Sequence, residues 1–234
     1  MFKAFAASEM TLAAGAYDLR ACVQLPPPGS TSDDYRLARL LDIVVALAAL
    51  VFLAPFMTII ALAVWSSGDP ILFRHQRIGK GGRSFSCLKF RTMHVNGDAL
   101  LADLLEHDAD ARAEWMLYHK LRRDPRVSRV GAFLRKTSLD ELPQLFNVLA
   151  GTMSIVGPRP IVQAEAGRYR RYFHTYCQVR PGITGLWQIS GRNTTTYRRR
   201  VACDVAYVRG KSAVGDLRII LRTVPAVFMG HGAY

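Results

Sequence analysis

Metal-binding and disulfide patterns are missing from this chain of 234 residues. Its four cysteines are scattered, without a C-x-x-C pair or a histidine at ligand spacing, and its six histidines show no mutual spacing that indicates a metal. We therefore predict neither a zinc site nor a disulfide framework. Reduced thiols in the cytosol are the simplest account of Cys22, Cys87, Cys177 and Cys203.

The chain also has few acidic residues relative to basic ones, with 18 Asp and Glu against 31 Lys and Arg. The resulting net charge of +13 suits three kinds of anionic partner: nucleic acid, a membrane surface with anionic lipids, or a phosphorylated substrate. A long apolar segment makes nucleic acid the poorest fit. We therefore expect anionic membrane lipids and phosphates as partners, and no nucleic acid.

This uncharged segment runs from Ile43 to Trp65 and has Pro55 at its centre. A straight helix of this length would measure roughly 35 Å, enough to cross a hydrocarbon core of about 30 Å. Pro55 lacks the amide hydrogen that a helix interior needs, which predicts a kink and two legs too short to span alone. Composition leaves two possibilities open: a tilted transmembrane helix, or a re-entrant hairpin that enters and leaves the same side of the membrane.

Basic residues flank this segment on both sides, with Arg36 and Arg39 before it and four cations between residues 74 and 83 after it. Because Lys and Arg collect on the cytoplasmic side, two basic flanks favour the hairpin. The segment starts too late and is too long for a secretory signal peptide, so we expect it to be retained as an anchor. The predicted location is the inner (cytoplasmic) membrane, with the rest of the chain facing the cytoplasm.

These features divide the chain into three predicted parts: a flexible tail at 1–34, a re-entrant membrane anchor at 35–66, and one compact cytoplasmic domain at 67–234. Extended stretches around 71–73 and 84–92, separated by a Lys-Gly-Gly turn, predict a short β-hairpin. Apolar residues at intervals of three or four between 99 and 120 predict one or two amphipathic helices. The expected fold is mixed α/β but mainly helical.

Two adjacent carboxylates, Asp140 and Glu141, begin a further predicted helix that extends to Leu149. Ser138 and Glu141 have the capping-box spacing, but this start would put Pro143 at the fifth helical position. If Asp140 is the N-cap instead, Pro143 falls in the first turn, where no amide partner is needed. On spacing alone, a structural role for two acids at a helix N-terminus is the more common one.

Basic residues predicted nearby favour a functional role. A site that handles phosphates needs cations to neutralise the oxygens and a carboxylate able to attack or to take a proton. Prolines on both sides of Arg159 would hold its guanidinium in one geometry for phosphate, although the same residues also suit a stiff turn with a solvated arginine. The candidate cations are Lys89, Arg91, Arg135 and Arg159.

Together, five motifs resemble the bacterial sugar transferase family, the small monotopic phosphoglycosyl transferases. They are LFRHQRIG at 72–79, KFRTM at 89–93, LRKTSLDELPQ at 134–144, MSIVGPRP at 153–160 and the glycine-punctuated stretch at 180–192. The similarity extends from about residue 35 to the C-terminus. Members of the family move a sugar phosphate from a nucleotide sugar to undecaprenyl phosphate, so the resemblance implies that reaction and a re-entrant anchor.

The resemblance also implies roles for individual residues. Asp140 matches the nucleophile that attacks the β-phosphorus of the nucleotide sugar, and Glu141 matches the second carboxylate, which assists Mg²⁺ binding or accepts a proton. These two residues are therefore also the expected Mg²⁺ ligands. One departure is visible, because the family often breaks its re-entrant helix at Ser-Pro and this chain has Ala54-Pro55. The expected substrate-binding residues are Lys89, Arg91, Arg135, Gln144, Arg159 and Arg180.

The implied donor is a UDP-sugar, either UDP-galactose or UDP-glucose, and the implied product is the first lipid-linked sugar in exopolysaccharide assembly. Two rival functions are a membrane-anchored lipid phosphatase, which would need no nucleotide, and a non-catalytic adaptor of a polysaccharide assembly complex. The basic stretch at 180–200 suits a contact in a homodimer as well as a nucleotide site.

Overall fold

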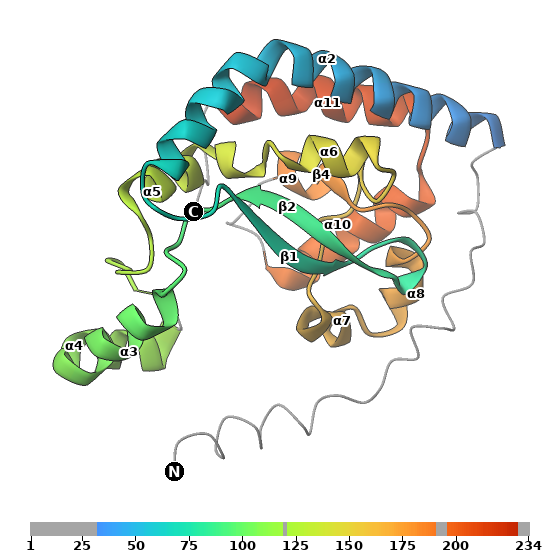
Figure 1. Ribbon diagram of the computed structural model, residues 1–234. Coiled ribbons are helices and arrows are strands. Elements are labelled where there is room, and N and C mark those ends of the chain that lie inside the picture. Colours follow the sequence, from blue (N-terminus) through green and yellow to red (C-terminus); the bar gives the residue numbers. More distant parts are fainter. Residues whose placement is uncertain (1–31, 119–120, 191–195, 229–234) are drawn as a thin grey trace. The chain divides into compact units, whose positions relative to one another are not determined.

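The computed structural model describes residues 32–118, 121–190 and 196–228, and Figure 1 shows a mainly helical chain with short strands. This confirms the coarse fold class predicted from the sequence. The predicted tail falls almost entirely outside the described residues, as do 191–195 of the fifth motif and the last six residues. The described residues form two compact units: unit 1 comprises 32–51, 74–87 and 144–228, and unit 2 comprises 52–73 and 88–143.

The apolar segment lies in one long helix, α2 (Ser32–Trp65), which is long and apolar enough to cross a membrane. The helix continues through Pro55, so two separate helical legs are not observed and the re-entrant hairpin stays a prediction. Beside the proline, the Thr58 hydroxyl donates a hydrogen bond of 2.9 Å to the Ala54 carbonyl. Such a bond to the carbonyl four residues earlier satisfies a polar group inside an apolar helix.

Many large apolar side chains of α2 are exposed. Phe52 and Val51 retain 82% and 78% of their accessible surface, and Ile59 and Trp65 retain more than 60%. A contiguous exposed apolar surface of this kind is a mark of a membrane or protein contact rather than of a soluble helix. The exposed apolar surface of α2 therefore supports its association with a membrane.

The polar N-terminal end of α2 is held in unit 1 by Asp42, whose side chain is buried. Its carboxylate accepts hydrogen bonds from the Ser154 hydroxyl at 2.8 Å and from the Ile155 amide at 2.7 Å. One turn earlier, the Arg39 guanidinium donates to the carbonyls of Val148 and Leu149 at 2.8 and 3.2 Å. Buried polar groups with satisfied partners fix a helix in one position, so this end of α2 has a defined register on unit 1.

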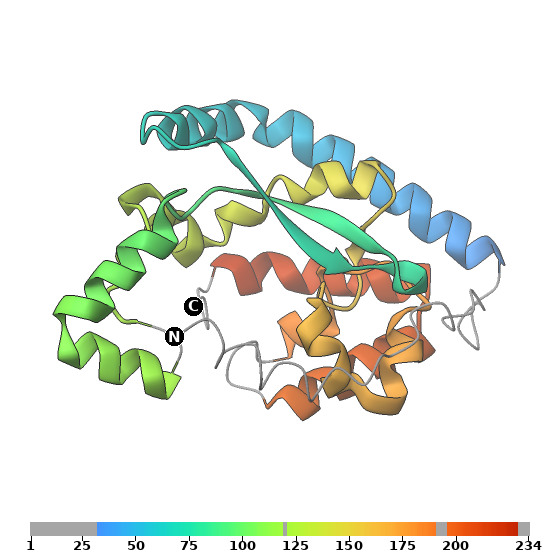
Figure 2. The same ribbon diagram turned by 60° about the horizontal axis from the view of Figure 1, so that its bottom comes forward.

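The predicted hairpin is present: β1 (Leu72–Ile78) pairs with β2 (Ser84–Phe90), as Figure 2 shows. A short 3₁₀ turn, η2 (Lys80–Gly82), joins the strands. Gly81 and Gly82 have φ values of 68° and 72°, which glycine adopts without the steric penalty of a Cβ atom. The Gly81 amide donates to the Cys177 carbonyl at 2.8 Å, which ties the turn to unit 1.

Unit 1 is built around two hydrophobic clusters. The first combines residues of α2, β2, α6 (Gln144–Leu149), β3 (Ser154–Val156) and α11 (Ala213–Phe228). The second combines α7 (Gln163–Tyr169), α8 (Phe173–Tyr176) and α10 (Tyr197–Arg209) with the end of β1. The remaining elements are η4 (Arg170–Tyr172), β4 (Gly182–Thr184) and α9 (Leu186–Ile189).

Strands β3 and β4 form a small parallel pair in which Ser154 faces Gly182 and Val156 faces Thr184. Just beyond β3, Gly157 lies against Gly182 so closely that a Cβ atom on either glycine would come within 2.6 Å of the other's backbone amide nitrogen. Only glycine permits this approach. The loop that follows, which carries Arg159, is thereby fixed against β4.

Unit 2 contains the second half of α2 and four further segments: α3 (Gly97–His107), α4 (Ala109–Tyr118), α5 (Arg129–Thr137) and the 3₁₀ turn η3 (Leu139–Glu141). The periodicity between 99 and 120 predicted one or two helices, and there are two. They separate at Asp108, which is extended and whose carboxylate caps α4 by accepting from the Ala111 amide at 2.9 Å.

Candidate active site

Three charged side chains meet in unit 2: Lys89, Asp140 and Glu141. The Lys89 ammonium donates to Asp140 Oδ2 at 3.0 Å and to Glu141 Oε1 at 2.8 Å, so one cation bridges two neighbouring carboxylates. All three side chains are largely shielded from solvent, and Asp140 retains only 8% of its accessible surface. We call this group the carboxylate dyad with its lysine.

Local backbone structure brings these groups together. Lys89 lies near the end of β2, while helix α5 leads to the two acids. Ser128 caps the start of α5 by accepting from the Gly131 amide at 2.9 Å, and Ser138 ends it with a φ of 59°. This left-handed residue turns the chain directly into η3, which carries the two acids.

The predicted start of the next helix is wrong in both versions. Asp140 and Glu141 lie in η3 rather than in the first turn of an α-helix, and Ser138 makes no side-chain capping bond to that turn. Helix α6 begins only at Gln144. Pro143 supplies one reason, because it has no amide hydrogen with which to continue the hydrogen bonding of the turn into an α-helix, although Leu142 before it keeps helical dihedrals of −53° and −37°. The α-helix therefore starts after the proline, and the acids occupy a separate tight turn.

Burial and charge act against each other at the dyad. Burial raises the pKa of Asp140 above its usual value, the Lys89 ammonium opposes this rise, and the Glu141 carboxylate adds to it. Burial would lower the pKa of Lys89, but the two carboxylates outweigh it and the pKa is raised. The lysine is therefore held in its charged form, and it stabilises the ionised form of an otherwise unfavourably buried aspartate.

Two predicted phosphate-binding arginines also belong to unit 2. The Nε of Arg135 donates to the Thr92 hydroxyl at 2.9 Å, and its positive charge lowers the pKa of Asp140. Arg135 is thus part of the electrostatic environment of the dyad. Arg91 instead donates from Nε to the Pro70 carbonyl at 3.0 Å and lies over the Phe73 ring. Its partners are structural, and no described contact connects it to the dyad.

The other predicted substrate-binding residues belong to unit 1. Gln144 is buried at the start of α6. Arg159 lies in the loop after β3, with its guanidinium carbon 5.6 Å from the centre of the Trp187 ring. Arg180 precedes β4 and donates from Nε to the Gly151 carbonyl at 2.7 Å.

A second basic cluster includes Arg159 and Arg200; the sequence predicted a basic stretch at 180–200 but not its contact with Trp187. The Arg200 guanidinium carbon lies 5.4 Å from the centre of the same Trp187 ring, so two arginines contact one indole. Arg200 is buried, yet its Nε and Nη2 have no hydrogen-bond partner among the described residues. Asp204, also buried, accepts from the Tyr169 hydroxyl at 2.6 Å, and burial raises its pKa to about 6.

The sequence also did not predict the contact between Lys89 and the two acids. The lysine was predicted to contact phosphate, and in the structure it bridges the two acids. The KFRTM motif placed this lysine among the candidates, but the sequence carries no local signal for its pairing with residues 51 and 52 positions later. Cluster members such as Arg200 and Trp187 come together only through packing of α9 and α10.

The donor set of the dyad limits the metals that it can hold. Among the described residues there is no group of three or more His, Cys, Asp or Glu side chains arranged for a metal ion. Mg²⁺ does not require such a group, because it commonly binds one or two carboxylates and completes its shell with water and substrate phosphates. Asp140 and Glu141 fit that chemistry.

Comparison with known proteins agrees with the predicted resemblance. The family model of bacterial sugar transferases matches residues 34–230. The chain is 48% identical over 197 residues to the exopolysaccharide production protein ExoY of Sinorhizobium fredii, covering 84% of this chain and 87% of that protein. It is 47% identical over 198 residues to the undecaprenyl-phosphate galactose phosphotransferase of Salmonella typhimurium, covering 85% of this chain and 42% of that protein.

A third relative is the UDP-glucose:undecaprenyl-phosphate glucose-1-phosphate transferase of Caulobacter vibrioides, 42% identical over 205 residues, which are 84% of this chain and 71% of that protein. The chain thus spans less than half the length of some curated relatives and most of the length of others. A match over more than four fifths of the chain at these identities shows the family. The chain belongs to the bacterial sugar transferase family.

Proposed function

We propose that this protein transfers a hexose 1-phosphate from UDP-galactose or UDP-glucose to undecaprenyl phosphate, as the first step of exopolysaccharide assembly. The observation that carries this proposal is the buried dyad bridged by Lys89 in a member of this family. Relatives named as galactose and glucose-1-phosphate transferases supply the donor and the acceptor.

In the proposed reaction, a carboxylate oxygen of Asp140 attacks the β-phosphorus of the UDP-sugar. A bond forms between that oxygen and the phosphorus, the bond to the bridging oxygen breaks, and UMP leaves. A phosphate oxygen of undecaprenyl phosphate then attacks the same phosphorus and releases Asp140. The two steps form a ping-pong sequence with a phospho-sugar aspartyl intermediate.

Lys89 supports this reaction because it opposes the rise in the pKa of Asp140 that burial causes, and so favours the ionised carboxylate. Nucleophilic attack needs the carboxylate, and a protonated acid would be a poor nucleophile. Arg135 adds positive charge to the same environment, which suits the negative oxygens of a transferring phosphoryl group. Glu141 shares the lysine, and its proposed role is to accept a proton or to hold a metal.

Mg²⁺ is the proposed cofactor, held by Asp140 and Glu141 together with substrate phosphates. When bound, the ion supplies charge neutralisation at the phosphoryl oxygens. In unit 1, Arg159 and Arg200 are proposed to contact phosphate, since two arginines gather around Trp187 and Arg200 has unpartnered donors among the described residues.

We further propose that α2 is the membrane anchor and that it re-enters the same side of the inner membrane, with the two units facing the cytoplasm. Its exposed apolar surface and the basic residues on both flanks support this arrangement. An anchor at the membrane surface suits a reaction between a soluble nucleotide sugar and a lipid whose phosphate stays at headgroup level.

The test uses the full chain in a membrane mimic with Mg²⁺, undecaprenyl phosphate and radiolabelled UDP-galactose or UDP-glucose. We expect label in the lipid fraction and release of UMP from one of these donors. Without acceptor, we expect labelled protein and no more than one UMP per enzyme. Asp140→Asn should lower transfer by about 10³-fold or more, as for other catalytic nucleophiles.

Asp110→Asn is the matched control, since it makes the same chemical change at an exposed residue of α4. It should keep wild-type transfer. Release of inorganic phosphate from undecaprenyl phosphate without any nucleotide would instead support a lipid phosphatase. Absence of transfer from every UDP-sugar, with folded protein, would support a non-catalytic adaptor.

A further inference from the structure

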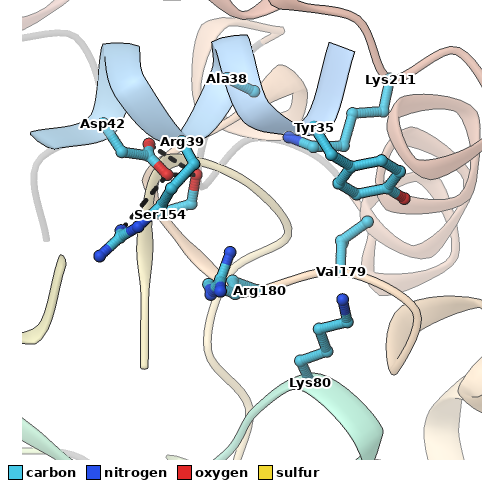
Figure 3. Close-up of a pocket in the computed structure, with 9 residues that line it drawn as sticks. All are labelled: Tyr35, Ala38, Arg39, Asp42, Lys80, Ser154, Val179, Arg180 and Lys211. Carbon is cyan, nitrogen blue, oxygen red and sulfur yellow. Dashed lines mark hydrogen bonds and ion pairs between the residues drawn. The ribbon is translucent and has the colours of Figure 1, made fainter. Parts of the chain in front are cut away.

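A pocket in unit 1 gathers four basic side chains next to the polar end of α2. It is a small hollow that is partly open to solvent, and Figure 3 shows the side chains around it. The cations are Arg39 of α2, Lys80 of the hairpin turn, Arg180 before β4 and Lys211 between α10 and α11. Its other lining residues are Tyr35, Ala38, Asp42, Ser154 and Val179.

Two of these four cations are already neutralised by acids. Lys211 forms an ion pair with Asp216 at 2.9 Å and also donates to the Tyr207 hydroxyl at 2.7 Å. Arg39 lies 3.7 Å from Asp42. Their charges are therefore largely balanced by carboxylates belonging to unit 1 itself.

Lys80 and Arg180 are different. Among the described residues, neither of them forms an ion pair with a carboxylate. The Lys80 ammonium lies 5.6 Å from the centre of the Tyr35 ring, and Arg180 uses its Nε for the Gly151 carbonyl. In Figure 3, both charged ends lie beside the pocket. Two cations without acid partners in a partly buried space favour an anion between them.

Electrostatics within the pocket agree with this view. Burial lowers the pKa of Lys80, and the nearby charges of Arg180 and Lys211 lower it further. Burial likewise lowers the pKa of Arg180, Arg39 adds to the effect, and Asp42 partly opposes it. The neighbouring cations thus disfavour the charged forms of Lys80 and Arg180, and a bound anion would relieve this repulsion.

The pocket also has a defined place along α2. Asp42, one of its lining residues, immediately precedes Ile43, the first residue of the uncharged apolar segment. If the apolar segment lies in hydrocarbon, a pocket at this boundary lies at the level of the lipid headgroups. Basic pockets at that level are suited to anionic lipid phosphates.

We propose that the pocket formed by Arg39, Lys80, Arg180 and Lys211 is a binding site for a phosphate group. Its placement beside the start of the apolar segment makes an anionic phospholipid headgroup the expected source, and a soluble phosphate is the other source to be distinguished. The site shares no residue with the dyad, and the proposal does not depend on the transfer reaction.

The test compares Lys80→Gln with Arg83→Gln in the full chain. Both changes remove one positive charge from the same turn, but Arg83 is exposed and does not line the pocket. Each protein is purified in neutral detergent micelles and titrated with phosphatidylglycerol or with phosphatidylcholine, and bound lipid is counted by native mass spectrometry. A separate titration uses inorganic phosphate and pyrophosphate, alone and in competition with phosphatidylglycerol.

We expect the wild-type protein and Arg83→Gln to bind phosphatidylglycerol in preference to phosphatidylcholine. Lys80→Gln should weaken that preference roughly tenfold, the value of about one charge-assisted hydrogen bond, and Lys80→Arg should restore most of it. Displacement of the lipid by millimolar phosphate or pyrophosphate, lost in Lys80→Gln, would identify a soluble phosphate as a competing source for the same site.

Two results would overturn the proposal. One is equal weakening by Lys80→Gln and Arg83→Gln, which would mean that overall surface charge attracts the lipid. The other is wild-type protein that prefers neither the anionic lipid nor soluble phosphate. Because binding and not transfer is measured, an inactive but phosphate-binding protein would refute the proposed function and leave this inference standing.

Discussion

Replacing Lys89 by methionine tests how the buried dyad is kept reactive. The ammonium makes two charge-assisted hydrogen bonds, of 3.0 Å to Asp140 and 2.8 Å to Glu141. Each bond of this kind contributes about 1.5 to 3 kcal/mol, and the three side chains keep between 11% and 26% of their exposure, which partly screens the charges. We therefore expect a total loss of about 3 kcal/mol of transition-state stabilisation.

A loss of about 3 kcal/mol corresponds to roughly a hundredfold decrease in kcat/KM for the UDP-sugar. The pH profile should change as well. Lys89 opposes the rise in the pKa of Asp140, while burial and Glu141 promote it. Without the lysine, the aspartate stays protonated to a higher pH, and the acid limb of kcat/KM should move to higher pH.

The assay measures UMP release and lipid-linked label between about pH 5.5 and 9 for wild type, Lys89→Met and Lys89→Arg. Lys89→Arg keeps the positive charge and should keep the acid limb close to that of wild type. Arg123→Met is the control, since it removes a cation from an exposed turn of unit 2. An unchanged acid limb in Lys89→Met, or an equal loss in the control, would refute the reasoning.

Three further predictions concern stability, measured by thermal unfolding in detergent. The pKa of Asp204 rises from 3.8 to about 6 on folding, so the folded protein binds this proton more tightly than the unfolded chain does. The free energy of unfolding should therefore fall by about 2 kcal/mol between pH 4 and 6, and Asp204→Asn should remove this dependence. Asp42→Ala should cost about 2 to 4 kcal/mol, since it leaves the buried Ser154 hydroxyl and Ile155 amide without an acceptor, whereas an exposed change such as Asp33→Ala should cost little. Gly131→Ala should destabilise unit 2 by about 1 to 3 kcal/mol, because its Cβ would lie 2.1 Å from a backbone oxygen; a loss below 0.5 kcal/mol would contradict this packing.

Local patterns in the sequence predicted the elements that depend on local physics. The glycine turn and the alternating residues around it predicted the hairpin, and the spacing of apolar residues predicted the helical region that contains α3 and α4. The position of the two acids was predicted less well. Pro143 predicts one of two helix starts, at Ser138 or at Asp140, whereas the chain forms a 3₁₀ turn before Pro143 and an α-helix after it.

For the functional residues, too, the sequence predicted the local motifs but not the contacts between distant positions. Motifs identified Asp140, Glu141 and Lys89 as candidates, and the structure joins them through two hydrogen bonds. That lysine and these acids are about 50 positions apart, so only tertiary packing brings them together. For the same reason, Arg200 and its contact with Trp187 could not be predicted, because α9 and α10 meet only in the folded chain.

The buried hydrogen bonds of Asp42 give the membrane helix a fixed starting point. Unit 1 holds this residue, and the apolar segment begins with the next residue, so no flexible joint separates unit 1 from the start of the exposed apolar surface. An α-helix rises about 1.5 Å and turns about 100° per residue. One residue added between Asp42 and Ile43 would therefore rotate the apolar side chains of residues 43–51 by more than a quarter turn relative to the anchored polar end. The direction in which this apolar surface faces is thus set by the hydrogen bonds of Arg39 and Asp42.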